Sequence, residues 1–257
     1  MNKPLVSVVM PAYRCADTIG AAIESVLCQN VDLELIIVDD CSPEDLEGAL
    51  APWREDPRVI YLKNEENLGA AASRNLAVDH ARGEYVAFLD SDDIWAPGKL
   101  EKQLKLLEET GLVLCCTARE LMTPEGKRTG RVIPVMERIS YRELMKHNSI
   151  NCSSVLMKTH VAREFPMCHE DSHEDYIMWL MVLRKYEFAC GINEPLLQYR
   201  LSATGKSGSK LKSAGMTFKV YRYMGFGLGK SLVLFASYAL HGVAKYALSS
   251  IGVKNEA

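Results

Sequence analysis

The sequence predicts an α/β protein built on a mostly parallel, Rossmann-like sheet with helices on both faces. Three observations support this fold class. Apolar runs of the β type alternate with helical patterns and short links over residues 1–117, the order expected of a parallel sheet. The composition is that of an ordinary globular protein, with 48% hydrophobic and 25% charged residues. Finally, two predicted strands end in acidic residues, which indicates a functional edge of the sheet.

In the first half of the chain, each strand is predicted from a short apolar run and each helix from one-sided apolar spacing or helix-start residues. One helix is predicted from its first turn, because Ser42-Pro43-Glu44-Asp45 combines Pro near the first position with acids. The predicted strands cover residues 5–10, 33–38, 59–62, 85–89 and 112–117. The predicted helices cover residues 18–29, a segment opened by Ser42, 69–82, and 97 to about 109.

After residue 117 the alternation becomes less regular. Pro124-Glu125-Gly126-Lys127 is typical of a hairpin turn. Helices are predicted over 140–146 and 174–185. Strands are predicted over 153–157, 188–190 and 196–201. A polar, Gly-containing segment over 202–210 is either a lid over the site or a linker to the last part of the chain.

Net charge and cysteine pattern limit the class of protein. The net charge of −3 gives no reason to expect a nucleic-acid partner. The eight cysteines form no CxxC pair, and most lie in apolar surroundings, which favours a reducing compartment. The amino terminus runs into a strand pattern without the apolar stretch of a signal peptide, so we expect a cytoplasmic location.

The segment after the fourth strand is the strongest candidate for chemistry. Asp90, Asp92 and Asp93 lie within four positions at the carboxyl end of that strand. Clustered carboxylates repel one another unless a cation bridges them, and Mg²⁺ or Mn²⁺ shared with substrate phosphates meets that need. The alternative is an acidic turn in which Asp92 or Asp93 only caps the next helix.

Other polar residues complete a nucleotide-diphosphate site on the same sheet edge. Asp39 or Asp40 could accept hydrogen bonds from a base or ribose. The helix that begins at Gly69 offers N–H groups to a phosphate. Arg74 could pair with a phosphate or with the aspartates. Such a set predicts group transfer from an activated donor, with the metal ion offsetting charge on the departing phosphate.

Several segments of the chain, in order, resemble family 2 glycosyltransferases of the GT-A fold. The matching segments are VSVVMPAY at 6–13, ELIIVDDCS at 34–42, NLGAAASRN at 67–75, GEYVAFLDSDDIWAPGKL at 83–100, and the Glu174-Asp175 and Tyr199-Arg200 pairs. The resemblance covers roughly residues 5 to 207. One departure is Met181, because the family often carries Arg at that position after the Trp.

The resemblance implies roles for individual residues. Pro11, Tyr13, Asp40 and Arg74 would line the nucleotide site, and Asp39 would support it. Asp90-Ser91-Asp92 would be the DxD metal motif, with Asp92 the direct ligand. Asp175 would be the general base that deprotonates an acceptor hydroxyl, giving single displacement with inversion, because a hydroxyl is a poor nucleophile until its proton has an acceptor.

Two patterns have competing interpretations. His169-Glu170-Asp171-Ser172-His173 fits the HExxH zinc-protease motif, with Glu194 as a third ligand, but the segment is acidic and lacks an apolar helix face. We therefore expect His173 beside the acceptor site or in a solvated loop. Trp95 and Trp179 are core anchors, or Trp95 contacts a sugar.

The carboxyl-terminal segment predicts helices with a basic surface. Residues 205–255 contain eight Lys or Arg and no Asp or Glu. The most apolar part, 231–240, is shorter than the roughly 20 residues a bilayer span needs. We expect either a helix lying in the membrane interface or a hairpin docked on protein. The apolar residues available for insertion are Phe226, Leu232, Leu234, Phe235 and Tyr238.

The sequence thus predicts three regions and one activity. Residues 1–117 would bind the nucleotide sugar, 118–207 the acceptor, and 208–257 would form a basic helical extension. We expect a metal-dependent, inverting glycosyltransferase that moves a sugar from a UDP-sugar to a polyprenyl-diphosphate-linked glycan in surface-polysaccharide synthesis, as a peripheral protein on the cytoplasmic face of the inner membrane. The alternatives are an inactive nucleotide-sugar-binding or scaffold protein of the same fold, and a nucleotidyltransferase.

Overall fold

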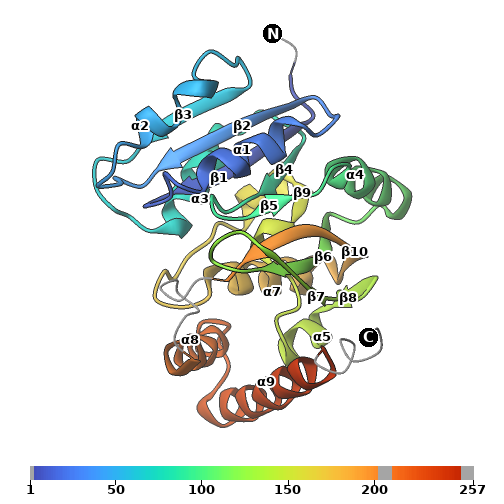
Figure 1. Ribbon diagram of the computed structural model, residues 1–257. Coiled ribbons are helices and arrows are strands. Elements are labelled where there is room, and N and C mark those ends of the chain that lie inside the picture. The colour runs from blue at the N-terminus through green and yellow to red at the C-terminus, as the bar shows by residue number, and fades with distance from the viewer. Residues whose placement is uncertain (1–2, 202–209, 250–257) are drawn as a thin grey trace, which may run out of the picture.

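The computed structural model describes residues 3–201 and 210–249, and within them one continuous sheet organises the protein. Ten strands form this sheet in the order β3-β2-β1-β4-β9-β6-β10-β5, with β7 paired to β6 and β8 to β10 (Figure 1). The strands are β1 (Val6–Ala12), β2 (Leu33–Asp39), β3 (Val59–Lys63), β4 (Tyr85–Phe88), β5 (Ile94–Trp95), β6 (Leu114–Met122), β7 (Arg128–Ile133), β8 (Arg138–Ser140), β9 (Leu156–Lys158) and β10 (Phe188–Arg200).

Strand directions confirm the predicted parallel arrangement for the first half and modify it for the second. β3, β2, β1 and β4 are mutually parallel. β9 then runs antiparallel to both β4 and β6, while β6 and β10 are parallel. β5, β7 and β8 add antiparallel edges. The sheet is therefore mixed, and the predicted boundary after residue 117 falls inside β6.

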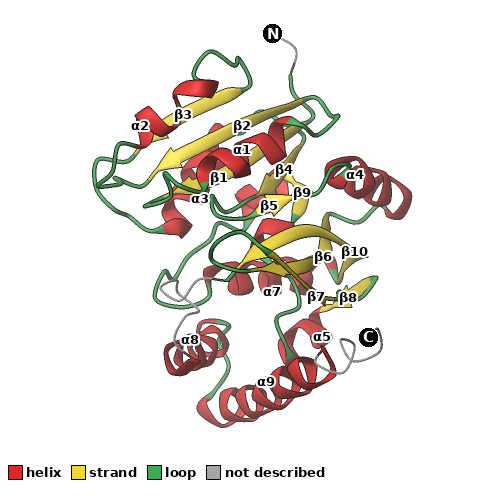
Figure 2. Ribbon diagram, viewed as in Figure 1, coloured by secondary structure: helices red, strands yellow, loops and turns green. Residues whose placement is uncertain are grey.

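Helices cover both faces of the sheet, as predicted (Figure 2). On one face, α1, α2 and α4 pack against Val8 and Ala87. On the other, α3, α5, α6 and α7 pack against Val9 and Val86. Because successive strand residues point to opposite faces, continuous apolar strands are expected where both faces are buried. The helices are α1 (Ile19–Leu27), α2 (Leu46–Ala49), α3 (Ala70–His80), α4 (Lys99–Thr110), α5 (Tyr141–Lys146), α6 (Thr159–Glu164), α7 (Glu174–Tyr186), α8 (Lys210–Tyr223) and α9 (Leu228–Ser249).

Several local predictions need correction. The helix expected to open at Ser42 begins at Leu46, where the Asp45 side chain caps it by accepting from the Gly48 N–H at 2.9 Å. The strand expected over 153–157 is β9, preceded by a 3₁₀ turn over Cys152–Ser154. The two strands expected near the end are one strand, β10, with an irregularity around Pro195. β5, β7, β8 and α6 were not predicted. The hairpin turn is confirmed, since the Thr123 N–H donates to the Lys127 carbonyl at 2.8 Å.

The two carboxyl-terminal helices lie together at the end of the molecule opposite β3 (Figure 1). α8 docks through buried residues, and the Tyr221 hydroxyl donates to the Met145 carbonyl at 2.8 Å. Tyr176 of α7 lies edge-on to Tyr221, with ring centroids 6.4 Å apart. Phe235 and Tyr238, which the interfacial alternative made available for insertion, pack against Phe218 and Tyr176, as the docked alternative predicts. Within the described residues, no helix is both long and apolar enough to cross a bilayer.

Lys99 of α4 provides a prediction about stability. Its side chain is fully buried, donates to the Gln103 Oε1 at 2.6 Å and lies 4.0 Å from the centre of the Trp95 ring. None of the ion pairs among the described residues includes it. Burial lowers the pKa of Lys99 from 10.5 to about 7. Between these values the unfolded chain binds more protons than the native one, so stability should rise with pH by up to about 1.4 kcal/mol per unit.

A Lys99→Met variant should remove this pH dependence while keeping most of the buried stem. In urea unfolding at pH 6 to 9, the variant should be the more stable protein at pH 6, and its advantage should shrink as the pH rises. A difference between the two proteins that stays constant over this range would contradict the prediction.

Candidate active site

The parallel strands bring three polar segments to one edge of the sheet. β1 aligns with β2 so that Ala12 is opposite Asp39, and with β4 so that Val9 is opposite Phe88. The Asp40 N–H donates to the Ala12 carbonyl at 2.9 Å. The carboxyl ends of β1, β2 and β4, with the residues that follow them, are therefore neighbours, as the sequence predicted.

Asp39 and Asp40 are buried and fully engaged within the protein. Asp39 accepts from the Ser42 N–H at 2.7 Å and from the Tyr61 hydroxyl at 2.8 Å. Asp40 accepts from the N–H groups of Leu68 and Gly69 at 2.9 and 2.8 Å, and also from the Asn64 amide. Both carboxylates therefore tie the end of β2 to its neighbours, and Asp40 connects β2 directly to the start of α3.

Pro11 and Tyr13, at the end of β1, are more open. The Tyr13 side chain is 41% exposed, and Pro11 is half-buried. The Arg14 guanidinium carbon lies 5.3 Å from the centre of the Tyr13 ring. An exposed aromatic ring beside a guanidinium is a surface on which a nucleobase can stack.

The acidic loop after β4 holds Asp90, Ser91, Asp92 and Asp93. The Asp90 N–H donates to the Ser153 hydroxyl at 3.2 Å, and Ser91 is buried. Burial and the neighbouring Asp90 raise the pKa of Asp92 to about 6. Burial, with Asp92 and Asp90, also raises the pKa of Asp93, whose Oδ2 is buried without a partner. The loop thus concentrates more negative charge than its surroundings neutralise.

Arg200, at the end of β10, fixes the back of this loop. Its N–H donates to Asp93 Oδ1 and its Nε to the Asp92 carbonyl, both at 2.8 Å. Its Nη1 donates to the Pro124 carbonyl in the β6–β7 turn, also at 2.8 Å. These bonds leave the Asp92 carboxylate itself without a basic partner among the ion pairs of the described residues. The Asp90-to-Asp93 loop does not cap the next helix, because that helix begins only at Lys99.

Arg74 of α3 joins this loop to α7. One end of its guanidinium pairs with Asp90 Oδ1 at 2.5 Å, and the other with Glu174 Oε1 at 3.1 Å. The side chain is buried, so the two carboxylates offset the cost of burying the charge. Arg74 was expected to pair with a phosphate or with an aspartate, and it pairs here with Asp90.

Asp175 lies in the first turn of α7, next to Glu174. Its Oδ1 accepts from the Tyr176 N–H at 2.7 Å. Burial raises the pKa of Asp175 to about 6, and Glu174 adds to the effect, while His173 and Arg74 oppose it. A carboxylate with a raised pKa at a helix start is suited to accept a proton near neutral pH.

The start of α3 is contacted by an acid, Glu170, that the sequence did not suggest for this position. Glu170 Oε2 accepts from the Ala71 N–H at 2.9 Å, so a carboxylate occupies the position predicted for a phosphate. Gly69 has a φ of 89°, and a Cβ there would lie 2.6 Å from Glu170 Cδ. The positive φ therefore favours glycine, and any larger residue would also displace the Glu170 side chain.

Trp95 and His173 are further residues for which the sequence left two interpretations or more. Trp95 is buried, and its Nε1 donates to the Ser153 carbonyl at 2.7 Å, so it is a core anchor like Trp179. His173 Nε2 contacts the Ser213 carbonyl, and no metal-binding group of three ligands occurs among the described residues, so the zinc interpretation finds no support. Ser153 and Glu174 were not singled out individually by the sequence. The predicted lid over 202–210 lies almost wholly outside the described residues.

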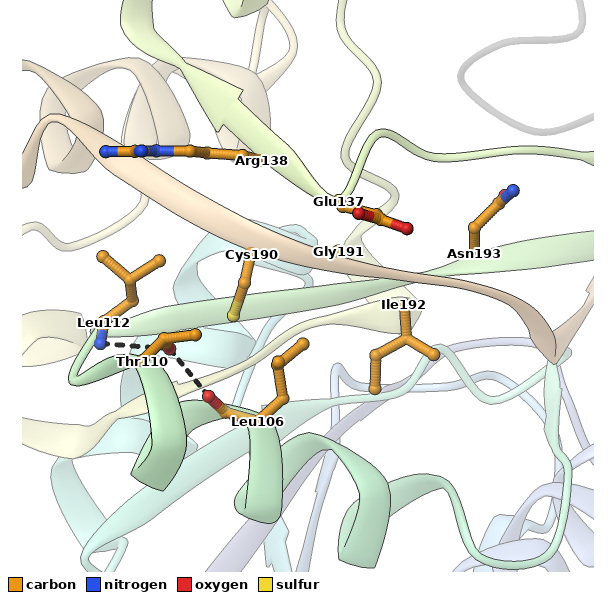
Figure 3. A pocket seen from close by; sticks show the side chains of 9 residues that line it. All are labelled: Leu106, Thr110, Leu112, Glu137, Arg138, Cys190, Gly191, Ile192 and Asn193. Carbon is orange, nitrogen blue, oxygen red and sulfur yellow. Dashed lines mark hydrogen bonds between the residues drawn. The ribbon is translucent and has the colours of Figure 1, made fainter.

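A separate pocket of about 690 Å³ lies away from these residues. It is lined by α4, β8 and the first part of β10, around Cys190, Ile192 and Arg138 (Figure 3). Arg200, which holds the acidic loop, is at the other end of β10. The pocket is therefore not part of the candidate site.

The chain is similar to known proteins both in sequence and in fold. The chain matches the model of Glycosyl transferase family 2 over residues 7–162. It is 37% identical to TuaG of Bacillus subtilis (strain 168), over 95% of this chain and 98% of that protein. TuaG is named as a teichuronic acid biosynthesis glycosyltransferase. It is 33% identical to the Escherichia coli UDP-Glc:alpha-D-GlcNAc-diphosphoundecaprenol beta-1,3-glucosyltransferase WfaP, over 95% and 96% of the two chains.

A solved structure supports the same fold. The mannosyltransferase PcManGT of Pyrobaculum calidifontis, determined with GDP-Man and Mn²⁺, superposes with a TM-score of 0.70 at 17% identity, covering 100% of this chain and 77% of that one. The mixed sheet, with helices on both faces, is thus that of the GT-A fold class. The chain belongs to glycosyl transferase family 2.

Proposed function

We propose that the protein is a metal-dependent, inverting glycosyltransferase that moves glucose or a related hexose from a UDP-sugar to a glycan linked to a polyprenyl diphosphate. The observation that carries the proposal is the Arg74 bridge. One guanidinium contacts both Asp90 of the acidic loop and Glu174, so a candidate metal ligand is joined by one side chain to the residue next to the candidate base, Asp175. The identity with WfaP, whose name states a UDP-Glc donor and a diphosphoundecaprenol-linked acceptor, supports the substrate classes.

The acidic loop fits a hard divalent cation. Asp92 is a half-buried carboxylate whose pKa is raised by burial and by Asp90, and Asp93 adds a buried oxygen without a partner. Mg²⁺ or Mn²⁺ is typically held by one or two carboxylates together with substrate phosphates, and this donor set matches. Asp90 and Asp92 would hold the ion. When bound, it would offset the charge that develops on the departing diphosphate.

The protein side chains have distinct roles in the proposed transfer. Tyr13 and Pro11 offer an open surface for the nucleobase of the donor, while Asp39 and Asp40 shape the loop behind this surface. Asp175 takes the proton of the acceptor hydroxyl. The hydroxyl oxygen bonds to the anomeric carbon of the donor sugar as the bond between that carbon and the diphosphate breaks. The attack comes from the side opposite the leaving group, so the anomeric configuration inverts.

A transfer assay tests the proposed function. Purified protein would be given UDP-glucose and a synthetic lipid carrying N-acetylglucosaminyl diphosphate, with Mn²⁺, Mg²⁺ or EDTA, and both UDP release and the lengthened glycolipid would be followed. GDP-, dTDP- and CMP-sugars would serve as alternative donors. Metal-dependent product formation with a UDP-sugar supports the proposal. Nucleotide binding without transfer to any acceptor would favour an inactive scaffold.

We also propose that the protein works at the cytoplasmic face of the membrane, because its acceptor would be lipid-linked. The first part of α9 exposes Leu228, Leu232 and Val233, which are 62%, 52% and 69% exposed. Lys230 on the same helix and Arg222 near the end of α8 are also exposed, and residues 201–255 contain no acid. Exposed apolar side chains on helices whose charged residues are basic suit an anionic bilayer surface.

Replacing Leu228, Leu232 and Val233 by serine should therefore weaken binding to phosphatidylglycerol vesicles by at least about tenfold. The wild type should bind these vesicles better than phosphatidylcholine, and less at high salt. Co-sedimentation measures both effects. A control with Val132→Ser and Met136→Ser, at two other exposed apolar positions, should bind like the wild type. Equal binding of the triple variant and the wild type would contradict the membrane role.

A further inference from the structure

Residues 167–173, here called the bridging segment, connect α6 to α7 and contact α3 on one side. The Met167 N–H donates to Asn75 Oδ1 at 2.9 Å, and the Asn75 amide returns a bond to the Met167 carbonyl at 2.7 Å. Glu170 accepts from the Ala71 N–H at the start of the same helix. One side of the bridging segment is thus attached to the helix that carries Arg74.

The other side of the bridging segment contacts α8. Asp171 pairs with Lys219 at 2.6 Å and accepts from the Tyr223 hydroxyl at 2.9 Å. The His169 ring stacks on the Tyr223 ring, with centroids 3.7 Å apart and planes 8° from parallel. His169 has a φ of 67°, a conformation that is uncommon for a residue other than glycine. Contacts with α8 therefore hold the segment where its own backbone is strained.

The bridging segment ends at His173, two residues before Asp175. His173 Nε2 lies 3.2 Å from the carbonyl and 3.3 Å from the hydroxyl of Ser213 in α8. The His173 carbonyl in turn accepts from the Ile177 N–H in the first turn of α7. Contacts at Asp171 and His173 thus connect the short segment before Asp175 both to α8 and to the first turn of α7.

We propose that Lys219 and Tyr223 of α8 are positioning residues for Asp175, acting through the bridging segment. The inference rests on the proposed function, since it takes Asp175 as the base. It extends the site beyond residue 162, where the match to the family model ends. Misplacing a reacting group by about 1 Å can cost about a hundredfold in rate, so contacts that fix the entry to α7 would act on catalysis.

The contacts of Lys219 and Tyr223 are not needed to dock α8. Met216, Val220 and Tyr221 of the same helix are buried and supply that attachment. Lys219 and Asp171, by contrast, are about half exposed, at 48% and 50%, and exposed ion pairs contribute little to stability. Removing them should therefore leave the fold in place and change the position of the segment.

The test uses full-length protein with UDP-glucose and the N-acetylglucosaminyl diphosphate lipid as acceptor. A Lys219→Ala/Tyr223→Ala variant should lose at least about tenfold in kcat, while its affinity for UDP with Mn²⁺ and its melting temperature stay near those of the wild type. Lys219→Arg and Tyr223→Phe, which keep the charge and the ring stack, should retain most of the rate. Lys185→Ala is the matched control, because it removes a similarly exposed pair with Glu164 at the far end of α7.

Each outcome decides the inference. A loss of kcat confined to the double variant supports it. Wild-type kcat in the double variant overturns it, and so does an equal loss in Lys185→Ala, which would indicate a general effect on α7. A loss that follows weaker UDP binding, or that comes with a lower melting temperature, also overturns it in favour of a structural role. Inactive wild-type protein would instead refute the proposed function, and this is established before the variants are compared.

Discussion

Replacement of Asp175 by asparagine is expected to lower kcat by about 10²- to 10⁴-fold, the range over which a general base typically contributes. Asparagine keeps the size of the side chain, and its Oδ1 can still accept from the Tyr176 N–H, which donates to Asp175 at 2.7 Å. It cannot take a proton from the acceptor. Because none of the hydrogen bonds or ion pairs found among the described residues joins Asp175 to the acidic loop, UDP affinity in Mn²⁺ should stay unchanged. Initial rates of UDP release with the lipid acceptor measure the effect.

The same residue predicts the pH dependence of the rate. Burial, with a contribution from Glu174, raises the pKa of Asp175 to about 6, and the base works only when it is ionised. The kcat of the wild type should therefore be level above about pH 6 and fall about tenfold per unit below it. The Asp175→Asn variant should lack this limb, whereas Glu164→Gln, an exposed acid on α6, should retain it. A wild-type rate that stays level down to pH 5 would mean that another group is the base.

The first half of the fold could be predicted because its strands are buried on both faces. β1, β2 and β4 consist of almost continuous apolar residues, and α1 and α3 between them are helices of 9 and 11 residues. β5 has only two residues, too few for any periodicity, and β9, which was expected over 153–157, has only three. β9 also lies between β4 and β6 by a long-range pairing that no local pattern encodes. At β10, two separate strands were expected over 188–190 and 196–201, but one strand continues through an irregularity at Pro195.

The candidate site was predictable where function requires unusual residue types in a fixed order. The acids after β2 and β4 stand out against apolar strands, whereas Asp175 lies in an acidic segment and was indicated by the family resemblance. The partners of those acids were not predictable, because they come from distant parts of the chain. Glu170 and Ala71 are 99 residues apart, and Glu174 and Arg74 are 100 apart. Several acids could have paired with Arg74, and only packing selects Asp90 and Glu174.

The Asp92→Asn substitution tests the metal motif, and it should abolish the metal-dependent part of UDP binding. In the wild type, saturating UDP with Mn²⁺ should stabilise the protein by about 2.7 kcal/mol at a hundred times the dissociation constant, seen as a higher melting temperature. The variant should show the same small shift with Mn²⁺ as with EDTA, and its transfer rate should fall by at least about a hundredfold. Asp79→Asn, at an exposed acid on α3, is the control and should respond like the wild type.

The structure favours Asp92 over Asp90 as the residue that responds most to the ion. Asp90 already pairs with Arg74 at 2.5 Å, whereas no described basic side chain pairs with the Asp92 carboxylate. Burial and Asp90 raise the pKa of Asp92 to about 6, so below that pH a metal ion must displace a proton. Apparent Mn²⁺ affinity should therefore fall as the pH decreases below 6 in the wild type. UDP binding by Asp92→Asn that remained as metal-dependent as in the wild type would move the metal site away from this loop.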